Sequence, residues 1–169
     1  MKGKYDESIH HRRSLRLRGY DYSQPGAYFV TTCTEDRECL FGDVVDGEMI
    51  LSEAGRVVQE TWESIPGRFQ SAVLDAFVVM PNHLHAIILL TETEGDSRPA
   101  LGDIIGAFKS ISAIGVNRLL SREGNPLWQR SYHDRILRSQ KELEDRRQYI
   151  ADNPVRWAED EENPRNWIK

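Results

Sequence analysis

Hydrophobic positions along the chain follow two different periods, and the change of period predicts where strands and helices lie. Runs rich in β-branched and aromatic residues, bounded by turn signals, predict strands at 28–34, 73–80, 84–90 and 133–138. The Asp46-Gly47 pair between two short apolar runs predicts a β-hairpin. Helical spacing of apolar residues predicts amphipathic helices at 52–64, 101–120 and 139–153.

The ends and faces of these helices support the prediction. Ser52 is expected to cap the first helix, and Ser139 with Glu142 three residues later forms a capping box for the last one. The buried face of the long middle helix is expected to carry the residues that recur at helical spacing, which are Ile104, Ile105, Phe108, Ile111 and Ile114.

The element order β-α-β-β-α-β, followed by a terminal helix, predicts an α+β fold. It is the ferredoxin-like split βαβ arrangement, with an antiparallel sheet, helices on one face and an additional C-terminal helix. A basic N-terminal arm is expected at 1–25, where Leu15 and Leu17 alternate with Arg16 and Arg18 in an extended pattern that ends in a turn. One domain at 26–157 and an acidic C-terminal tail at 158–169 complete the chain.

Composition narrows the class of protein. A chain of 169 residues with 39% hydrophobic and 29% charged residues is typical of one globular domain. No apolar run is long enough to span a bilayer and the first residues lack a signal-peptide core, so we expect a cytoplasmic protein with no membrane partner. Cys33 and Cys39 have no metal-knuckle spacing and are expected to be reduced thiols.

The net charge of −5 is unevenly distributed. Basic residues are concentrated in the first twenty positions, whereas Glu159–Glu162 form an acidic run. That run is expected to be either a solvated tail or a segment that repels DNA or covers an empty DNA groove by mimicking phosphate. Arg37 and Arg68 are expected to be surface residues.

Two histidines are the first candidates for chemistry. Because strand side chains alternate, His83 and His85 lie on one side of a strand and Leu84 on the other. Two imidazoles so placed can bind one metal ion. The alternative is a pair of surface histidines on a half-exposed strand.

Tyr149 and Asn153 are the second pair of candidates, since positions i and i+4 share one helix face. A phenol and an amide carbonyl there can serve as nucleophile and third metal ligand. The alternatives are an ordinary tyrosine and an Asn that caps a new turn before Pro154, a residue that also disfavours helical backbone at Asn153.

Four motifs in order, VVMPNHLHAIILL, AFKSISA, LWQRSYHDRILRS and YIADNPVRW, resemble the REP-associated tyrosine transposases within the single-tyrosine HUH (IS200-like) family. The likeness begins at GYDYSQPGAYFVTTCT and reaches about Trp157. It implies a ferredoxin-like nuclease in which Tyr149 is the nucleophile and His83, His85 and Asn153 bind Mg²⁺ or Mn²⁺. It further implies cleavage of single-stranded, hairpin-bearing DNA through a 5′-phosphotyrosine and a free 3′-hydroxyl, in transposition or in processing of palindromic repeats.

The partner is then DNA, and either a monomer or a homodimer fits the resemblance. Candidate phosphate contacts, each of which is otherwise a solvated surface group, are Arg12, Arg13, Arg16, Arg18, Lys109, Ser110, Arg130, Arg135 and Arg138. Two other functions remain open from the residues themselves. One is a hydrolytic metalloenzyme, which leaves Tyr149 without a role, and the other is a DNA-binding module that does not cleave.

Overall fold

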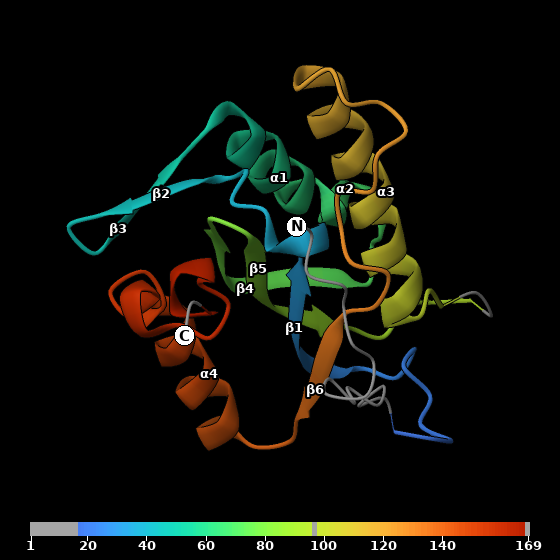
Figure 1. The fold of residues 1–169 in the computed structure, drawn as a ribbon. Helices are drawn as coiled ribbons and strands as arrows, with labels where there is room; N and C mark the ends of the chain where they lie inside the picture. The colour runs from blue at the N-terminus through green and yellow to red at the C-terminus, as the bar shows by residue number, and fades with distance from the viewer. Residues whose placement is uncertain (1–16, 96–97, 168–169) are drawn as a thin grey trace.

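The computed structural model describes residues 17–95 and 98–167. Its centre is a four-stranded antiparallel sheet in the order β4-β5-β1-β6 (Figure 1). The strands are β1 (Gly26–Cys33), β4 (Ala72–Met80), β5 (His83–Leu90) and β6 (His133–Leu137). Counted along the chain, the sheet order is second, third, first, fourth. This is the split βαβ order, so the ferredoxin-like prediction is confirmed.

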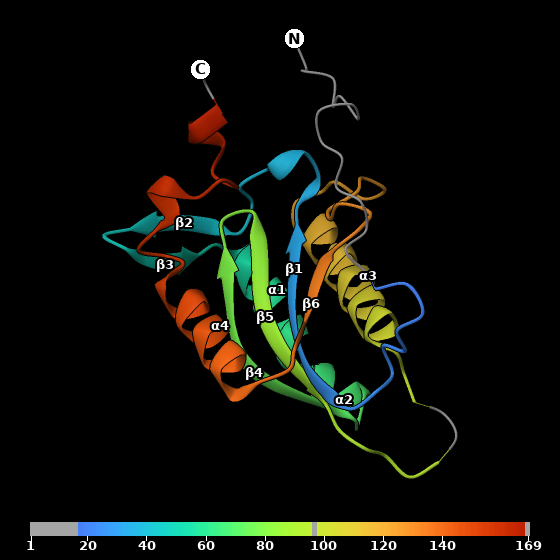
Figure 2. The same ribbon diagram turned by 90° about the horizontal axis from the view of Figure 1, so that it is seen from below.

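Helices cover the two faces of the sheet unequally (Figure 2). One face carries α1 (Glu53–Glu63), α2 (Ile65–Arg68) and α3 (Leu101–Leu119), and the main core lies beneath them, with Trp62 and Phe108 fully enclosed. The opposite face carries α4 (Gln140–Asp152), which packs Ile150 onto a smaller apolar cluster. None of the described helices combines the length and apolar content needed to cross a bilayer.

Short elements complete the description. The strands β2 (Gly42–Val45) and β3 (Glu48–Leu51) form the predicted hairpin, which extends away from the sheet (Figure 1). Asp46 and Gly47 both have positive φ, 51° and 77°, as a tight hairpin turn requires. Three 3₁₀ turns are η1 (Glu35–Arg37), η2 (Trp157–Glu159) and η3 (Pro164–Trp167).

The buried face of α3 differs from the predicted one. Ile114 is 57% exposed, whereas Ser112 and Val116 are fully buried. Ser112 can occupy the core because its hydroxyl donates to the carbonyl of Phe108 and accepts from the indole N–H of Trp128. The helix therefore turns a satisfied polar residue inward, and an apolar pattern alone does not contain that information.

Two terminal features also differ from expectation. Ser139 accepts the backbone N–H of Glu142 as predicted, but the Glu142 carboxylate accepts the N–H of Arg138 instead of that of Ser139. The end of the N-terminal arm turns where an extended segment was expected, because Gly19 has φ 77° and the N–H of Tyr20 donates to the carbonyl of Leu17. Residues 1–16, with Arg12, Arg13 and Arg16, lie outside the described residues.

The packing of α1 gives a test of the fold. Replacing a helical glycine with alanine normally stabilises a protein by up to about 1 kcal/mol. A Cβ at Gly55 would instead overlap the carbonyl oxygen of Phe41, whereas a Cβ at Gly106 in α3 would meet no atom within 4 Å. We expect Gly55→Ala to lower the free energy of unfolding by about 2 kcal/mol and Gly106→Ala to raise it, as measured by urea denaturation. A Gly55→Ala protein as stable as the unsubstituted one would contradict this packing.

Candidate active site

His83 and His85 lie at the start of β5, on the side of the sheet that faces α4. Their ring centroids are 4.5 Å apart, and Leu84 between them points into the main core. The prediction that the two imidazoles share one side is confirmed. His83 is 0% exposed and His85 5% exposed, so the alternative of two surface histidines is wrong.

Asn82 determines which nitrogen of His83 is available. The Asn82 Nδ2 donates to the carbonyls of Arg37 and Glu162, at 3.1 and 2.7 Å, so its Oδ1 is the atom that faces His83 Nδ1 at 2.8 Å. An amide oxygen only accepts, and His83 Nδ1 therefore carries the proton. The lone pair of His83 lies on Nε2, which is buried and has no hydrogen-bond partner.

Thr31 contacts Nδ1 of His85 in the way that Asn82 contacts Nδ1 of His83. Thr31 and His85 are paired across β1 and β5, and Thr31 Oγ1 lies 2.6 Å from His85 Nδ1. When the hydroxyl accepts from Nδ1–H, the Nε2 of His85 is free to bind a cation. Neither Thr31 nor Asn82 was singled out from the sequence. Asn82 directly precedes His83, but Thr31 comes from another strand and only the strand register reveals it.

A β-bulge and an ion pair hold α4 over this end of the sheet. Between Leu74 and Phe77, β4 has one residue more than its partner β5. In this bulge the Asp75 carboxylate accepts two hydrogen bonds from Arg147 of α4, at 2.8 and 2.7 Å. The Arg147 guanidinium accordingly lowers the pKa of Asp75.

Helix α4 brings Tyr149 and Asn153 to the histidines. The Tyr149 ring lies 5.2 Å from the His85 ring and 6.0 Å from Phe29, and its side chain is 38% exposed. Asn153 is 3% exposed, directly after the last residue of α4. The i, i+4 prediction of a shared face is confirmed. Of the two alternatives for Tyr149, a core-facing or a surface tyrosine, the exposure of the side chain rules out the first.

The alternative role of Asn153, capping a new turn before Pro154, is wrong. Its backbone is helical, with φ −59° and ψ −43°, although Pro154 follows. Its Oδ1 is buried and has no hydrogen-bond partner, so it caps no turn. The contacts of α4 with the sheet outweigh the local preference imposed by the proline, and the amide oxygen remains available as a ligand.

Burial determines the protonation of the site. It lowers the pKa of His83 to about 3, an effect that the Asn153 side chain offsets only in part, and it lowers the pKa of His85 well below the ordinary value. Both imidazoles are therefore neutral at pH 7 and able to bind a cation. Burial, followed by the charge of Asp160, raises the pKa of the Tyr149 phenol, which is protonated at neutral pH.

The donor atoms fit a divalent cation. Within 17–95 and 98–167 no group of three His, Cys, Asp or Glu side chains could hold a metal. Two buried atoms of the site without a described hydrogen-bond partner, Nε2 of His83 and Oδ1 of Asn153, could instead serve as one nitrogen and one oxygen ligand. His85 adds a second imidazole. Such a set leaves coordination positions open for phosphate oxygens.

The acidic C-terminal tail packs over the histidine end of this site. Trp157 lies 6.0 Å from the His83 ring, and the carbonyl of Glu162 accepts from Asn82. The Glu162 carboxylate, 6% exposed with its residue, pairs with Arg37. A solvated tail is therefore wrong for Glu162, and Arg37, predicted as a surface residue, is only partly exposed. Arg37 and Glu162 are 125 positions apart in the sequence, so no local sequence pattern predicts this pair.

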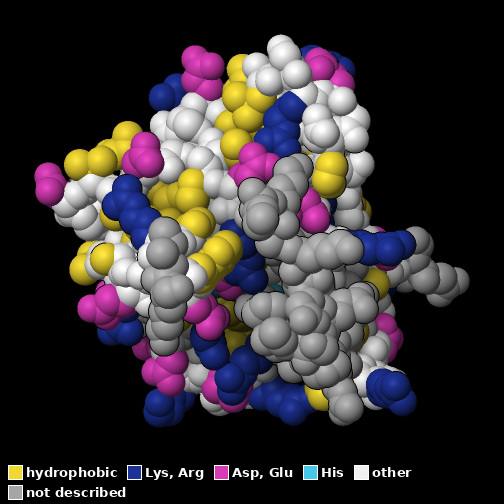
Figure 3. Space-filling model, in the orientation of Figure 1, with side chains coloured by type: hydrophobic (Ala, Val, Ile, Leu, Met, Phe, Trp, Pro, Cys, Tyr) yellow, Lys and Arg dark blue, Asp and Glu magenta, His cyan; other side chains and the backbone are white. Residues whose placement is uncertain are grey.

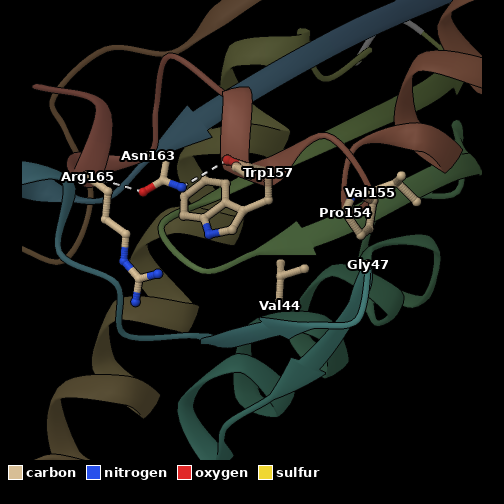
Figure 4. Close-up of a pocket in the computed structure, with 8 residues that line it drawn as sticks. Val44, Gly47, Pro154, Val155, Trp157, Asn163 and Arg165 are labelled. Carbon is tan, nitrogen blue, oxygen red and sulfur yellow. Dashed lines mark hydrogen bonds between the residues drawn. The ribbon is translucent and has the colours of Figure 1, made fainter.

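A cavity of about 290 Å³ separates the tail from the β2–β3 hairpin. Val155 and Trp157, directly before the tail, line it together with Asn163 of the tail, and Val44 and Gly47 line it from the hairpin (Figure 4). Asn163 connects two other residues that line the cavity. Its amide donates to the carbonyl of Trp157, and its Oδ1 accepts from the N–H of Arg165.

The proposed DNA contacts are not gathered around this site. Lys109 and Ser110 lie on α3, across the sheet from Tyr149, and Lys109 Nζ donates to the carbonyls of Gln129 and Arg130. The side chains of Arg18, Arg130, Arg135 and Arg138 are exposed. In Figure 3, the visible Lys and Arg side chains of the described residues are interspersed with Asp and Glu. Their contact with DNA stays a prediction.

Comparison with known proteins gives a consistent result. The family model described as "Transposase IS200 like" matches residues 27–153, a span that contains both histidines, Tyr149 and Asn153. An uncharacterized protein of Haemophilus influenzae is 36% identical over 181 residues, covering 95% of this chain and 98% of its own. A second Haemophilus influenzae protein, named as a REP-associated tyrosine transposase, is 26% identical and covers 80% of this chain and 74% of its own.

Two solved structures share the fold. One is a REP-associated tyrosine transposase bound to a REP hairpin, with a TM-score of 0.62 and 19% identity, covering 83% of this chain and 73% of that one. The other is a transposase from Deinococcus radiodurans, with a TM-score of 0.50 and 21% identity, covering 81% and 95%. The resemblance that the four sequence motifs indicated is confirmed. The chain belongs to the IS200-like transposases, a family of DNA-processing enzymes.

Proposed function

We propose that this chain is a single-tyrosine endonuclease and strand transferase that cleaves single-stranded DNA through Tyr149. The proposal rests on two buried atoms that could bind a metal, Nε2 of His83 and Oδ1 of Asn153, neither of which has a hydrogen-bond partner among the described residues. The exposed phenol of Tyr149 lies beside them, one helical turn before Asn153. A buried polar atom without a partner costs about 1–3 kcal/mol, and a bound cation at this site would satisfy both atoms at once.

The residues divide the chemistry between them. His83, His85 and Asn153 would hold Mg²⁺ or Mn²⁺, which when bound withdraws electron density from the scissile phosphate. Asn82 keeps the proton of His83 on Nδ1, so that its Nε2 is free to act as a ligand. In the proposed site the Thr31 hydroxyl accepts from Nδ1–H of His85, which leaves the Nε2 of His85 free as well. Imidazole ligands by themselves favour metals such as zinc or nickel, whereas magnesium prefers oxygen ligands and retains waters, which this small ligand set allows. We propose Mg²⁺ or Mn²⁺ because the family resemblance implies them.

Tyr149 forms the covalent bond. Its Oη attacks phosphorus, the Oη–P bond forms, the P–O3′ bond breaks, and the phenolic proton leaves while the 3′ oxygen gains one. The products are a 5′-phosphotyrosine and a free 3′-hydroxyl. Because one ester replaces another, the energy of the bond is kept and a 3′-hydroxyl can reverse the step. This reversibility suits strand transfer better than hydrolysis.

The substrate we propose is single-stranded DNA that carries a hairpin. The solved REP-associated tyrosine transposase that shares this fold is bound to a REP hairpin, and the comparison supports transposition or processing of palindromic repeats as the role of this chain. All four site residues come from β5, α4 and the residue directly after α4 in one chain, which supports an active site that is complete in a monomer. A homodimer is not required for it.

The nucleophile can be tested by substitution. We expect Tyr149→Phe to abolish the covalent adduct between protein and a 3′-labelled, hairpin-bearing oligonucleotide on denaturing gels, because phenylalanine has no attacking oxygen. Tyr132→Phe is the control, since Tyr132 packs against the main core on the other side of the sheet. An adduct that survives Tyr149→Phe but not Tyr132→Phe would show that Tyr132, and not Tyr149, is the nucleophile.

The ligands can be tested without DNA, by following Mn²⁺ binding with electron paramagnetic resonance. His83→Ala and His85→Ala should each weaken binding by more than about 100-fold, and Asn153→Ala by about 10-fold because both imidazoles remain. Tyr149→Phe should bind Mn²⁺ normally. The metal scheme fails if the histidine variants bind like the unsubstituted protein, or if cleavage persists in EDTA.

The role of Thr31 has a matched control on the adjacent residue. Thr31→Val keeps the shape of the side chain but removes the partner of His85 Nδ1, and we expect Mn²⁺ affinity to fall by about 10-fold to 100-fold. Thr32 is also buried, on the opposite face, and its hydroxyl has no hydrogen-bond partner. Thr32→Val should therefore leave Mn²⁺ affinity unchanged. Equal effects of the two substitutions would assign Thr31 a purely structural role.

A further inference from the structure

We propose that Arg146 is a further catalytic residue, whose guanidinium binds the non-bridging oxygens of the phosphate that Tyr149 attacks. The inference rests on the proposed function, because it assigns this residue to the same reaction. It deepens that function by adding a fixed positive charge, supplied by the protein itself, beside the nucleophile.

The helical register places Arg146 at the site. Positions 146, 149, 150 and 153 share the face of α4 that meets the sheet, and Ile150 of this set is buried in the apolar cluster. The guanidinium carbon of Arg146 lies 4.9 Å from the ring centroid of Phe29 and 5.5 Å from that of Tyr149. Phe29 in turn stacks on His85, with centroids 5.5 Å apart. Arg146 is thus held between the tyrosine and a ring that touches a histidine.

No carboxylate of the described residues forms a salt bridge with Arg146. Other cations of the same helix have carboxylate partners, because Lys141 pairs with Asp145 and Arg147 pairs with Asp75. Among the residues that the structure describes, Arg146 has no such partner. The carboxylate one turn before it, Glu142, accepts the N–H of Arg138 and pairs with Arg135. Within 17–95 and 98–167, the positive charge beside the nucleophile therefore has no paired anion.

A phosphate is the anion that this position fits. When Tyr149 Oη bonds to phosphorus and the P–O3′ bond lengthens, negative charge increases on the non-bridging oxygens. A planar guanidinium can donate two parallel hydrogen bonds to those oxygens and keeps its own protons throughout the step. The cation–π contacts with Phe29 and Tyr149 orient the group before DNA arrives, so that little reorganisation is needed.

The alternative is that Arg146 has a purely structural role and stabilises the packing of α4 through its contact with Phe29. The two roles differ in what they change, since a structural role alters stability and the position of every residue on α4. A catalytic role alters the rate constant of the chemical step in bound DNA, and it does so equally for cleavage and for rejoining, because both pass through one transition state.

The test measures single-turnover cleavage at saturating concentrations of a hairpin-bearing oligonucleotide that the unsubstituted protein cleaves. We expect Arg146→Gln to reduce the rate constant by about 100-fold or more, with less than a 10-fold change in Kd and an unchanged thermal unfolding midpoint. Arg146→Lys keeps the positive charge but loses the paired N–H donors of the guanidinium. Its rate constant should lie between those of the unsubstituted protein and Arg146→Gln. Lys141→Gln removes one charge from an exposed position on the same helix and should cleave normally.

The reverse reaction separates the outcomes further. Purified covalent adduct of the Arg146→Gln protein, given a 3′-hydroxyl strand, should rejoin more slowly by the same factor as cleavage. A normal rate constant for Arg146→Gln, or a loss confined to Kd or to the unfolding midpoint, overturns the role of Arg146 while the Tyr149 adduct stands. An unsubstituted protein that forms no Tyr149 adduct overturns the proposed function itself.

Discussion

The docking of α4 on the open face of the sheet is the interaction on which the site depends. Half of the candidate site belongs to the sheet and half to this helix, and only their contact brings Tyr149 and Asn153 to the two histidines. The contact is small: Ile150 packs against Phe29, Ile87 and Leu137, a far smaller cluster than the main core. The Arg147–Asp75 pair is partly exposed and adds little energy, but its two parallel hydrogen bonds fix the helix at one position along β4.

A second constraint is the fixed orientation of the imidazoles. Buried histidines are normally satisfied on both nitrogens, but here Asn82 and Thr31 satisfy one nitrogen of each ring. Nε2 of His83 has no hydrogen-bond partner among the described residues. The arrangement costs folding free energy, at about 1–3 kcal/mol for each unpartnered group. A cation between the rings and the Asn153 amide would remove that cost. The fold thereby holds a ligand set in position before the metal and the DNA arrive.

Much of this arrangement follows from the sequence because it depends on local periodicity. Strand alternation places His83 and His85 together, the Asp46-Gly47 turn places the hairpin, and helical spacing places Tyr149 and Asn153 on one face. Arg146 could have been found by the same rule, since it lies one turn before Tyr149 on that face.

What the sequence could not supply depends on partners far apart in the chain. Thr31 reaches His85 only through strand register, and Glu162 reaches Arg37 only because the tail folds back over β5. The helical backbone of Asn153 contradicts the local effect of Pro154, since the packing of α4 outweighs it. Ser112 is buried because Trp128 satisfies it, a contact that no apolar pattern predicts.

The central claim, that Tyr149 attacks DNA within a site built by β5 and α4, is tested most directly by mapping the covalent adduct. The protein would be allowed to react with a hairpin-bearing oligonucleotide, digested with nuclease and trypsin, and examined by mass spectrometry. Cleavage after Arg147 and Arg156 releases a peptide whose one tyrosine is Tyr149. We predict that this peptide carries the mass of a 5′-linked nucleotide. A nucleotide on the peptide 131–135, which contains Tyr132, or DNA cleaved with no nucleotide on any tyrosine peptide, would contradict the account.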